Sequence, residues 1–115
     1  MCYNLKILRL VNIEIVDCQD ISNNYLTHLI IVSTLCLNFR FLNLKYLPSL
    51  NVIVIEQIRT MDIDGFIEQL SLYKHNIQKI IFVASENHVK HCNYQKQWDK
   101  IKTYCDDNNI KLKFK

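Results

Sequence analysis

Four stretches of this 115-residue chain share one apolar pattern, with a large aliphatic or aromatic residue at the first, fourth and sixth places. Successive stretches begin 21, 24 and 27 residues apart. The triplets are Leu5, Leu8 and Leu10; Leu26, Leu29 and Ile31; Leu50, Ile53 and Ile55; and Ile77, Ile80 and Phe82. Self-similarity at a period of roughly 20 to 50 residues is typical of repeat architectures. The pattern therefore predicts stacked units that each pack on their neighbours.

The segments around the triplets, 5–15, 26–33, 50–57 and 77–84, are rich in aliphatic residues and are predicted to be strands. Helical spacing of apolar residues predicts helices over 37–47, ending at Pro48, over 64–75, with Asp64 as N-cap, and around Trp98. The polar segments 17–24 and 86–93 are read as loops. The last six residues, IKLKFK, alternate lysines with apolar residues, which predicts an edge strand.

Strands separated by helices indicate right-handed crossovers and a parallel sheet. The single Gly and single Pro argue against a hairpin-rich fold and against a glycine-rich phosphate loop. We therefore expect one α/β domain over 1–115. Residues 1–85 would form four irregular repeats, and residues 86–115 a divergent closing helix and edge strand. The expected architecture is a short βα solenoid with four to five parallel strands and helices on one face.

The phrase LKYLPSLNVIVI resembles the LxxLPxLxxLxL phrase of leucine-rich repeats. The matching residues are Leu44, Leu47, Leu50, Ile53 and Ile55. Across residues 1–85 the chain is most similar to the irregular repeats of F-box-associated leucine-rich repeat proteins, although it contains no F-box. The resemblance implies a non-catalytic protein–protein interaction module with no cofactor, and substrate recognition for a ubiquitin ligase.

In such a solenoid, the strand residues between the triplets face solvent and form the partner-binding surface. Here they are Arg9, Val11, Ile30, Val32, Val54, Glu56, Ile81 and Val83. Most are apolar, and strands that are apolar on both faces are also typical of a parallel sheet covered on both sides. A compact three-layer α/β domain, in which these residues are core, is therefore the alternative fold.

Two alternative functions accompany these folds. A compact domain would place a ligand-binding or enzymatic site at the carboxyl ends of the strands, near Thr34, Gln57, Arg59, Asp62 and Ser85. The chain also begins inside a repeat, with no polar capping unit before Leu5. It would then be a truncated remnant of a longer repeat protein that self-associates through its uncapped N-terminal end.

Two groups of side chains are candidates for a metal or catalytic site. His88, His91 and Cys92 are close in sequence, with Cys105 one helix later, but their spacing matches no usual zinc finger. Asp62, Asp64 and Glu68 are better explained by capping and the dipole of a helix N-terminus. No Gly-x-Ser-x-Gly motif exists. We predict neither a metal site nor catalytic residues.

Cysteine usage and charge constrain the compartment and the partners. The five cysteines form no CxxC pair, which favours free thiols in the reducing cytoplasm or nucleus. Residues 90–115 carry seven Lys against three acids, yet no Arg, which favours a solvated helix face over nucleic-acid binding. No signal peptide is visible, and the longest apolar stretch is too short to span a membrane.

Overall fold

The computed structural model describes residues 6–11, 24–32, 44–56, 60–72, 75–93 and 95–115. This part of the chain forms five strands, three α-helices and one 3-10 helix. The strands are β1 (Ile7–Val11), β2 (His28–Val32), β3 (Val52–Glu56), β4 (Lys79–Val83) and β5 (Lys111–Phe114). The helices are the 3-10 helix η2 (Leu44–Tyr46), α1 (Ile63–Leu72), α2 (Glu86–Cys92) and α3 (Gln95–Asp107).

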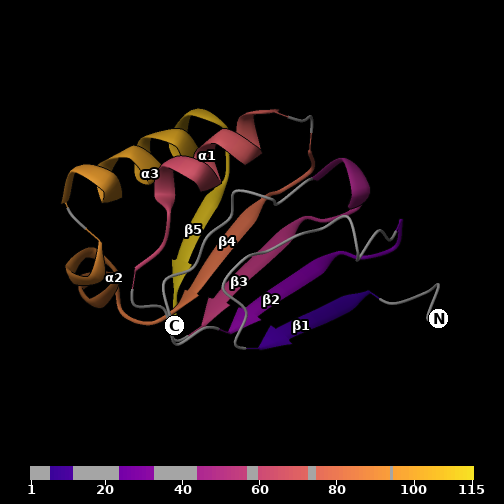
Figure 1. Cartoon of the computed structure of the whole chain (residues 1–115), viewed down its shortest axis with the longest axis horizontal. Coiled ribbons are helices and arrows are strands. Elements are labelled where there is room, and N and C mark those ends of the chain that lie inside the picture. The colour runs from indigo at the N-terminus through magenta and orange to yellow at the C-terminus, as the bar shows by residue number, and fades with distance from the viewer. Residues whose placement is uncertain (1–5, 12–23, 33–43, 57–59, 73–74, 94) are drawn as a thin grey trace.

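The five strands form one parallel sheet in chain order, β1-β2-β3-β4-β5, as Figure 1 shows. The register joins equivalent places of the triplets. The fourth places align as Leu8, Leu29, Ile53, Ile80 and Leu112, and the sixth places as Leu10, Ile31, Ile55, Phe82 and Phe114. The triplets thus predicted the strands, and their equivalent places prove to be register partners.

The backbone just before each strand also repeats. At each step a backbone carbonyl accepts a hydrogen bond from the backbone N–H of the equivalent residue in the next unit. The carbonyl and N–H pairs are Lys6 and Thr27, Thr27 and Asn51, Asn51 and Gln78, and Gln78 and Lys111. These four bonds have donor–acceptor distances of 2.8 to 3.0 Å. The starts of the five strands therefore stack on one another with the same backbone geometry.

All three α-helices pack on one face of the sheet. Phe66 and Leu70 of α1, Val89 of α2 and Trp98 of α3 belong to the same buried cluster as the triplet residues of β2, β3 and β4. Parallel crossovers are right-handed in nearly all proteins, so the successive crossovers from β3 to β4 and from β4 to β5 place α1, α2 and α3 on the same side. The predicted α/β fold is confirmed, with five parallel strands. Among the described residues, no α-helix lies on the second face of the sheet.

Several element predictions need correction. The segment 86–93 was predicted to be a loop, but Glu86–Cys92 is helix α2, which buries Val89. Of the helix predicted over 37–47, the structure describes only the 3-10 helix Leu44–Tyr46. Helix α3 ends at Asp107, and Asn109 just beyond it adopts the left-handed conformation with φ 58°.

Candidate functional site: the open face of the sheet

The eight residues predicted to bind a partner lie on the sheet face opposite the helices, which we call the open face. They form two cross-strand rows: Arg9, Ile30, Val54 and Ile81, and then Val11, Val32, Glu56 and Val83. Alternation along each strand separates this face from the core, because successive side chains point to opposite sides. The structure thus brings all eight residues together.

Exposure of the open face varies from edge to centre. Val11 and Val83 are 49% and 38% exposed, whereas Ile30, Val54 and Ile81 are half-buried. Val32 is only 4% exposed, which differs from its predicted accessibility. Val32 is therefore packed within the molecule and is not a contact residue in this conformation.

An ion pair crosses the open face. A guanidinium nitrogen of Arg9 on β1 lies 3.4 Å from a carboxylate oxygen of Glu56 on β3. Because neighbouring strands are about 4.8 Å apart, these side chains must reach over β2 to meet. Both are partly exposed, so the pair contributes little to stability but fixes two charges at one border of the aliphatic centre.

The opposite border of the open face carries lysines that the sequence analysis did not assign to the site. Lys79 on β4 is directly opposite Lys111 on β5, and Lys113 is opposite Ile81. The alternation in IKLKFK indicated that its lysines share one face. Only the register with β4 shows that this face is the open face and that Lys79 joins them.

Of the alternative site at the carboxyl ends of the strands, the structure describes only Asp62 and Ser85. Asp62 and Ser85 both cap helices. A carboxylate oxygen of Asp62 accepts a hydrogen bond from the Gly65 N–H, and the Ser85 hydroxyl oxygen accepts one from the His88 N–H. Thr34, Gln57 and Arg59 lie outside the described residues. Ligands of open α/β sheets bind where the strand order reverses, and this order contains no reversal.

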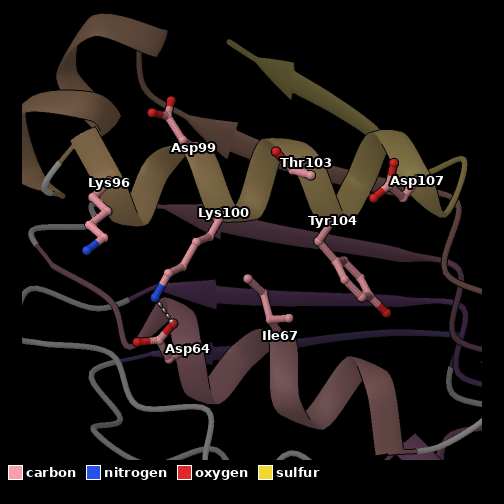
Figure 2. Close-up of a pocket in the computed structure, with 8 residues that line it drawn as sticks. All are labelled: Asp64, Ile67, Lys96, Asp99, Lys100, Thr103, Tyr104 and Asp107. Carbon is pink, nitrogen blue, oxygen red and sulfur yellow. Dashed lines mark hydrogen bonds and ion pairs between the residues drawn. The ribbon is translucent and has the colours of Figure 1, made fainter.

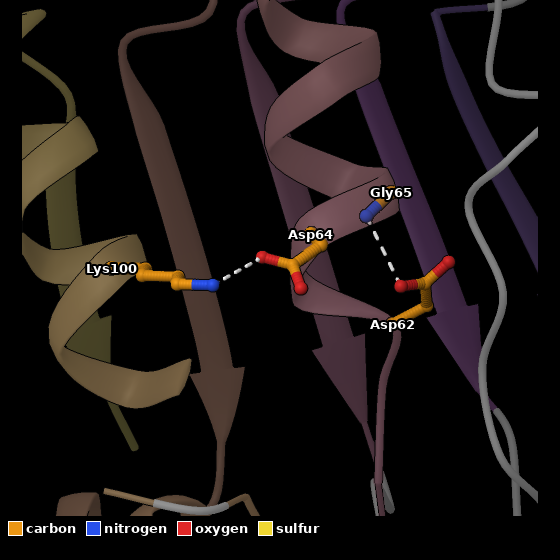
Figure 3. Close-up of polar contacts among 4 residues, drawn as sticks. All are labelled: Asp62, Asp64, Gly65 and Lys100. Carbon is orange, nitrogen blue, oxygen red and sulfur yellow. Dashed lines mark hydrogen bonds and ion pairs between the residues drawn. The ribbon is translucent and has the colours of Figure 1, made fainter. Parts of the chain in front are cut away.

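The N-cap of helix α1 lies two residues earlier than predicted. The N-cap is Asp62, whose carboxylate lies 3.1 Å from the Gly65 nitrogen, whereas Asp64 forms an ion pair of 3.0 Å with Lys100 of α3 (Figure 3). A Cβ atom at Gly65 would collide with the Asp62 carboxylate. Position 65 therefore needs glycine because of the cap, and not because of its φ angle.

We predict strong coupling between Gly65 and Asp62. Gly65→Ala alone should give no net gain in the free energy of unfolding. The higher helix propensity of alanine stabilises by about 1 kcal/mol, and loss of the Asp62 cap destabilises by about 1 kcal/mol. In an Asp62→Ala background, where the obstacle is gone, the same substitution should stabilise the protein by about 1 kcal/mol. Urea unfolding of the four proteins in this cycle measures the coupling. Equal effects of Gly65→Ala in both backgrounds would contradict it.

Of the sequence cluster around helix α2, the structure brings two side chains together. His88 and Cys92 are one turn apart, with the ring Nε2 and Sγ separated by 3.5 Å. Among the residues that the structure describes, no group of three His, Cys, Asp or Glu side chains is arranged to hold a metal ion. Cys105 is fully buried in the core, and burial raises the pKa of its thiol to about 12, so it stays protonated and unreactive.

A groove of about 560 Å³ lies between α1 and α3 on the outer side of the helical layer. Figure 2 shows the Ile67 and Tyr104 side chains in this groove and the Lys100–Asp64 ion pair across it. The other lining residues are Lys96, Asp99, Thr103 and Asp107. Charges of both signs line the groove, so its chemistry selects no ligand class.

His75, which follows α1, gives the fold a dependence on pH. Burial lowers the pKa of its imidazole below 6.5, an effect partly opposed by a hydrogen bond with the Leu70 backbone. Its Nδ1 accepts from the Ile77 N–H at 3.2 Å, which needs the neutral ring. The unfolded chain therefore binds a proton at a higher pH than the folded chain, and this linkage makes stability fall as the pH is lowered through 6.5.

We expect His75→Asn to weaken that pH dependence, because the Asn side chain offers an acceptor to Ile77 but does not titrate. The measurement is the urea midpoint of both proteins at pH values on either side of the ordinary histidine pKa, about 6.5. The parent should lose more stability than the variant between the high and the low pH. Identical losses would show that His75 does not carry this linkage.

Comparison with known proteins finds no family model, no curated protein and no solved structure that matches the chain. Within the described ranges, no helix has the length and apolar character needed to cross a membrane.

Proposed function

We propose that this protein is a non-catalytic protein-binding module that captures its partner on the open face. The observation that carries the proposal is the asymmetry of the sheet. The described helices all pack on one face. On the opposite face lie two rows of mainly aliphatic side chains, and all of them except Val32 stay partly exposed. A contiguous apolar patch on a folded protein marks an interaction surface, because keeping it in water is unfavourable.

The centre of the open face is an aliphatic cluster held by three strands. Ile30, Val54 and Ile81 are adjacent on three neighbouring strands and are half-buried before any partner binds. The hydrogen-bonded sheet holds them in place, so little conformational entropy is lost on binding. Arg9 and Glu56 supply polar contacts at the border, where charges give specificity more than affinity.

The resemblance to F-box-associated repeats extends this proposal to the role of the partner, which would be a substrate presented to a ubiquitin ligase. Ligase contacts would then use another surface. Ligase subunits should be recovered equally with the parent protein and with a variant whose open face is disrupted, while the substrate is lost. Loss of both together would argue against this division of surfaces.

The test of the open face is the double substitution Ile30→Asp and Ile81→Asp. We expect the variant to fold, because both side chains are already partly exposed, but to lose its partner. A matched control carries Leu72→Asp and Thr103→Asp on exposed positions of α1 and α3. Proteins retained from a cell extract by each immobilised variant are quantified by mass spectrometry.

The expected result is a set of proteins that the parent and the control retain and the open-face variant loses. Circular dichroism and urea unfolding verify that all three proteins are folded. An unchanged set with the open-face variant would contradict the proposal.

A further inference from the structure

The charges on the open face are segregated. Arg9 and Glu56 neutralise each other at the β1 side, whereas Lys79, Lys111 and Lys113 lie together on β4 and β5. None of these three lysines has an ion pair within the described part of the chain. We call them the lysine border. Among the described side chains, the open face therefore carries three positive charges without an ion-pair partner next to its aliphatic centre.

Folding alone does not explain this arrangement. Like charges directly opposite each other on neighbouring strands are destabilising, and Lys79 and Lys111 are register partners. Lysines on an edge strand discourage unwanted strand addition, which accounts for Lys111 and Lys113 on β5. That reason does not apply to Lys79, because β4 is an interior strand. An anionic group bound between the lysines would relieve their repulsion.

The neighbouring side chains indicate which anionic partner fits. Nucleic acids bind through phosphate contacts together with aromatic stacking of unpaired bases. The described rows of the open face contain no Phe, Tyr or Trp, and their single Arg is paired with Glu56. Aliphatic residues beside lysines instead complement a peptide that combines carboxylates with aliphatic side chains.

We infer that the open face binds an acidic protein segment, whose carboxylates meet the lysine border while its aliphatic side chains contact Ile30, Val54 and Ile81. This inference rests on the proposed function and names the chemistry of the partner. Long-range attraction to the lysine border would steer the segment onto the face, so the affinity should fall with increasing salt.

The probes are four fluorescein-labelled peptides that combine Glu or Lys with Leu or Ser. About ten residues suffice, because an extended chain of roughly 3.3 Å per residue then crosses five strands spaced roughly 4.8 Å apart. Fluorescence anisotropy should show binding of the Glu–Leu peptide, weakened by salt. The Glu–Ser, Lys–Leu and Lys–Ser peptides should bind at least about tenfold more weakly, which corresponds to about 1.4 kcal/mol.

Charge reversal locates the contact. Lys111→Glu with Lys113→Glu should weaken binding of the Glu–Leu peptide by about tenfold or more. The matched control, Lys96→Glu with Lys102→Glu, makes the same change of net charge on exposed positions of α3 and should leave the affinity nearly unchanged. An equal loss in both variants would mean that net charge alone attracts the peptide, and would overturn the inference.

Three other outcomes would also overturn it: equal binding of the Glu–Ser peptide, tighter binding of an oligouridine RNA, or a dimer in sedimentation that Ile81→Asp dissociates. The last would make a second copy the occupant. The inference and the proposed function fail separately. If Lys111→Glu with Lys113→Glu leaves partner capture intact while Ile30→Asp with Ile81→Asp abolishes it, only the inference is wrong. If neither double variant alters capture, the inference and the proposed function are both wrong.

Discussion

Replacing Trp98 by alanine is expected to lower the free energy of unfolding by about 3 to 5 kcal/mol. Trp98 is completely buried on α3, and its ring centroid lies 6.0 Å from that of Phe82 and 5.7 Å from that of Phe114. These contacts join the last helix to β4 and β5. Because small domains are stable by only about 5 to 15 kcal/mol, the variant should be marginally folded or unfolded.

Trp98→Phe separates the ring contacts from the indole N–H. The Nε1 atom is buried without a hydrogen-bond partner among the described residues, and an unsatisfied buried donor costs about 1 to 3 kcal/mol. Phenylalanine removes that donor and keeps most of the aromatic packing. Its loss of stability should therefore be less than half that of alanine. Urea unfolding followed by far-UV circular dichroism measures the stability of the parent, Trp98→Ala and Trp98→Phe. Equal losses for both variants would contradict the conclusion that the aromatic contacts of Trp98 stabilise the fold.

The strands and their register could be predicted because one local pattern carries both. An apolar residue at the fourth and sixth places points to one face of a strand, and recurrence of the triplet makes equivalent residues partners. Leu29, Ile53 and Ile80 are all fully buried in one cross-strand row. The strand ends were less accurate, since the described strands have four or five residues and the predicted segments were longer.

Helix α2 could not be predicted from periodicity, because Val89 is its one buried side chain. The helix depends on tertiary packing of that residue and on the Ser85 cap, which carries no Glu or Gln partner three residues later. The N-cap of α1 was assigned to Asp64 and not to Asp62 for a similar reason. Two aspartates lie within one turn, and only the backbone path decides which one caps the helix.

The residues of the open face were predictable, but their environments were not. Alternation along the strands assigns a residue to a face without saying what covers it. Val32 is buried although Val11 and Val83 in the same row are exposed. The lysine border was missed because β5 belongs to the divergent unit, where no complete triplet sets the register. Its alignment with Lys79 depends on the length of α3 and the turn at Asn109.

A pair of neighbouring substitutions on β4 should have opposite consequences. Ile80 is fully buried between Ile53 and Leu112, whereas Ile81, the next residue, lies half-buried on the open face. Ile80→Asp loses about 2 to 5 kcal/mol of apolar burial and adds an unpaired buried carboxylate, which costs several kcal/mol more. Together these losses match the whole stability of a small domain, so we expect Ile80→Asp to be unfolded.

Ile81→Asp should remain folded, because its carboxylate reaches solvent and lies in register with Lys113. Far-UV circular dichroism and the dispersion of amide signals in an NMR spectrum distinguish the two outcomes, with Ile80→Val as a control that keeps the shape of the side chain. Folding would then depend on the even-numbered face of β4 and partner capture on the odd-numbered face. Unfolding of Ile81→Asp would instead mean that the second face of the sheet is also core, and the open face would no longer be a binding surface.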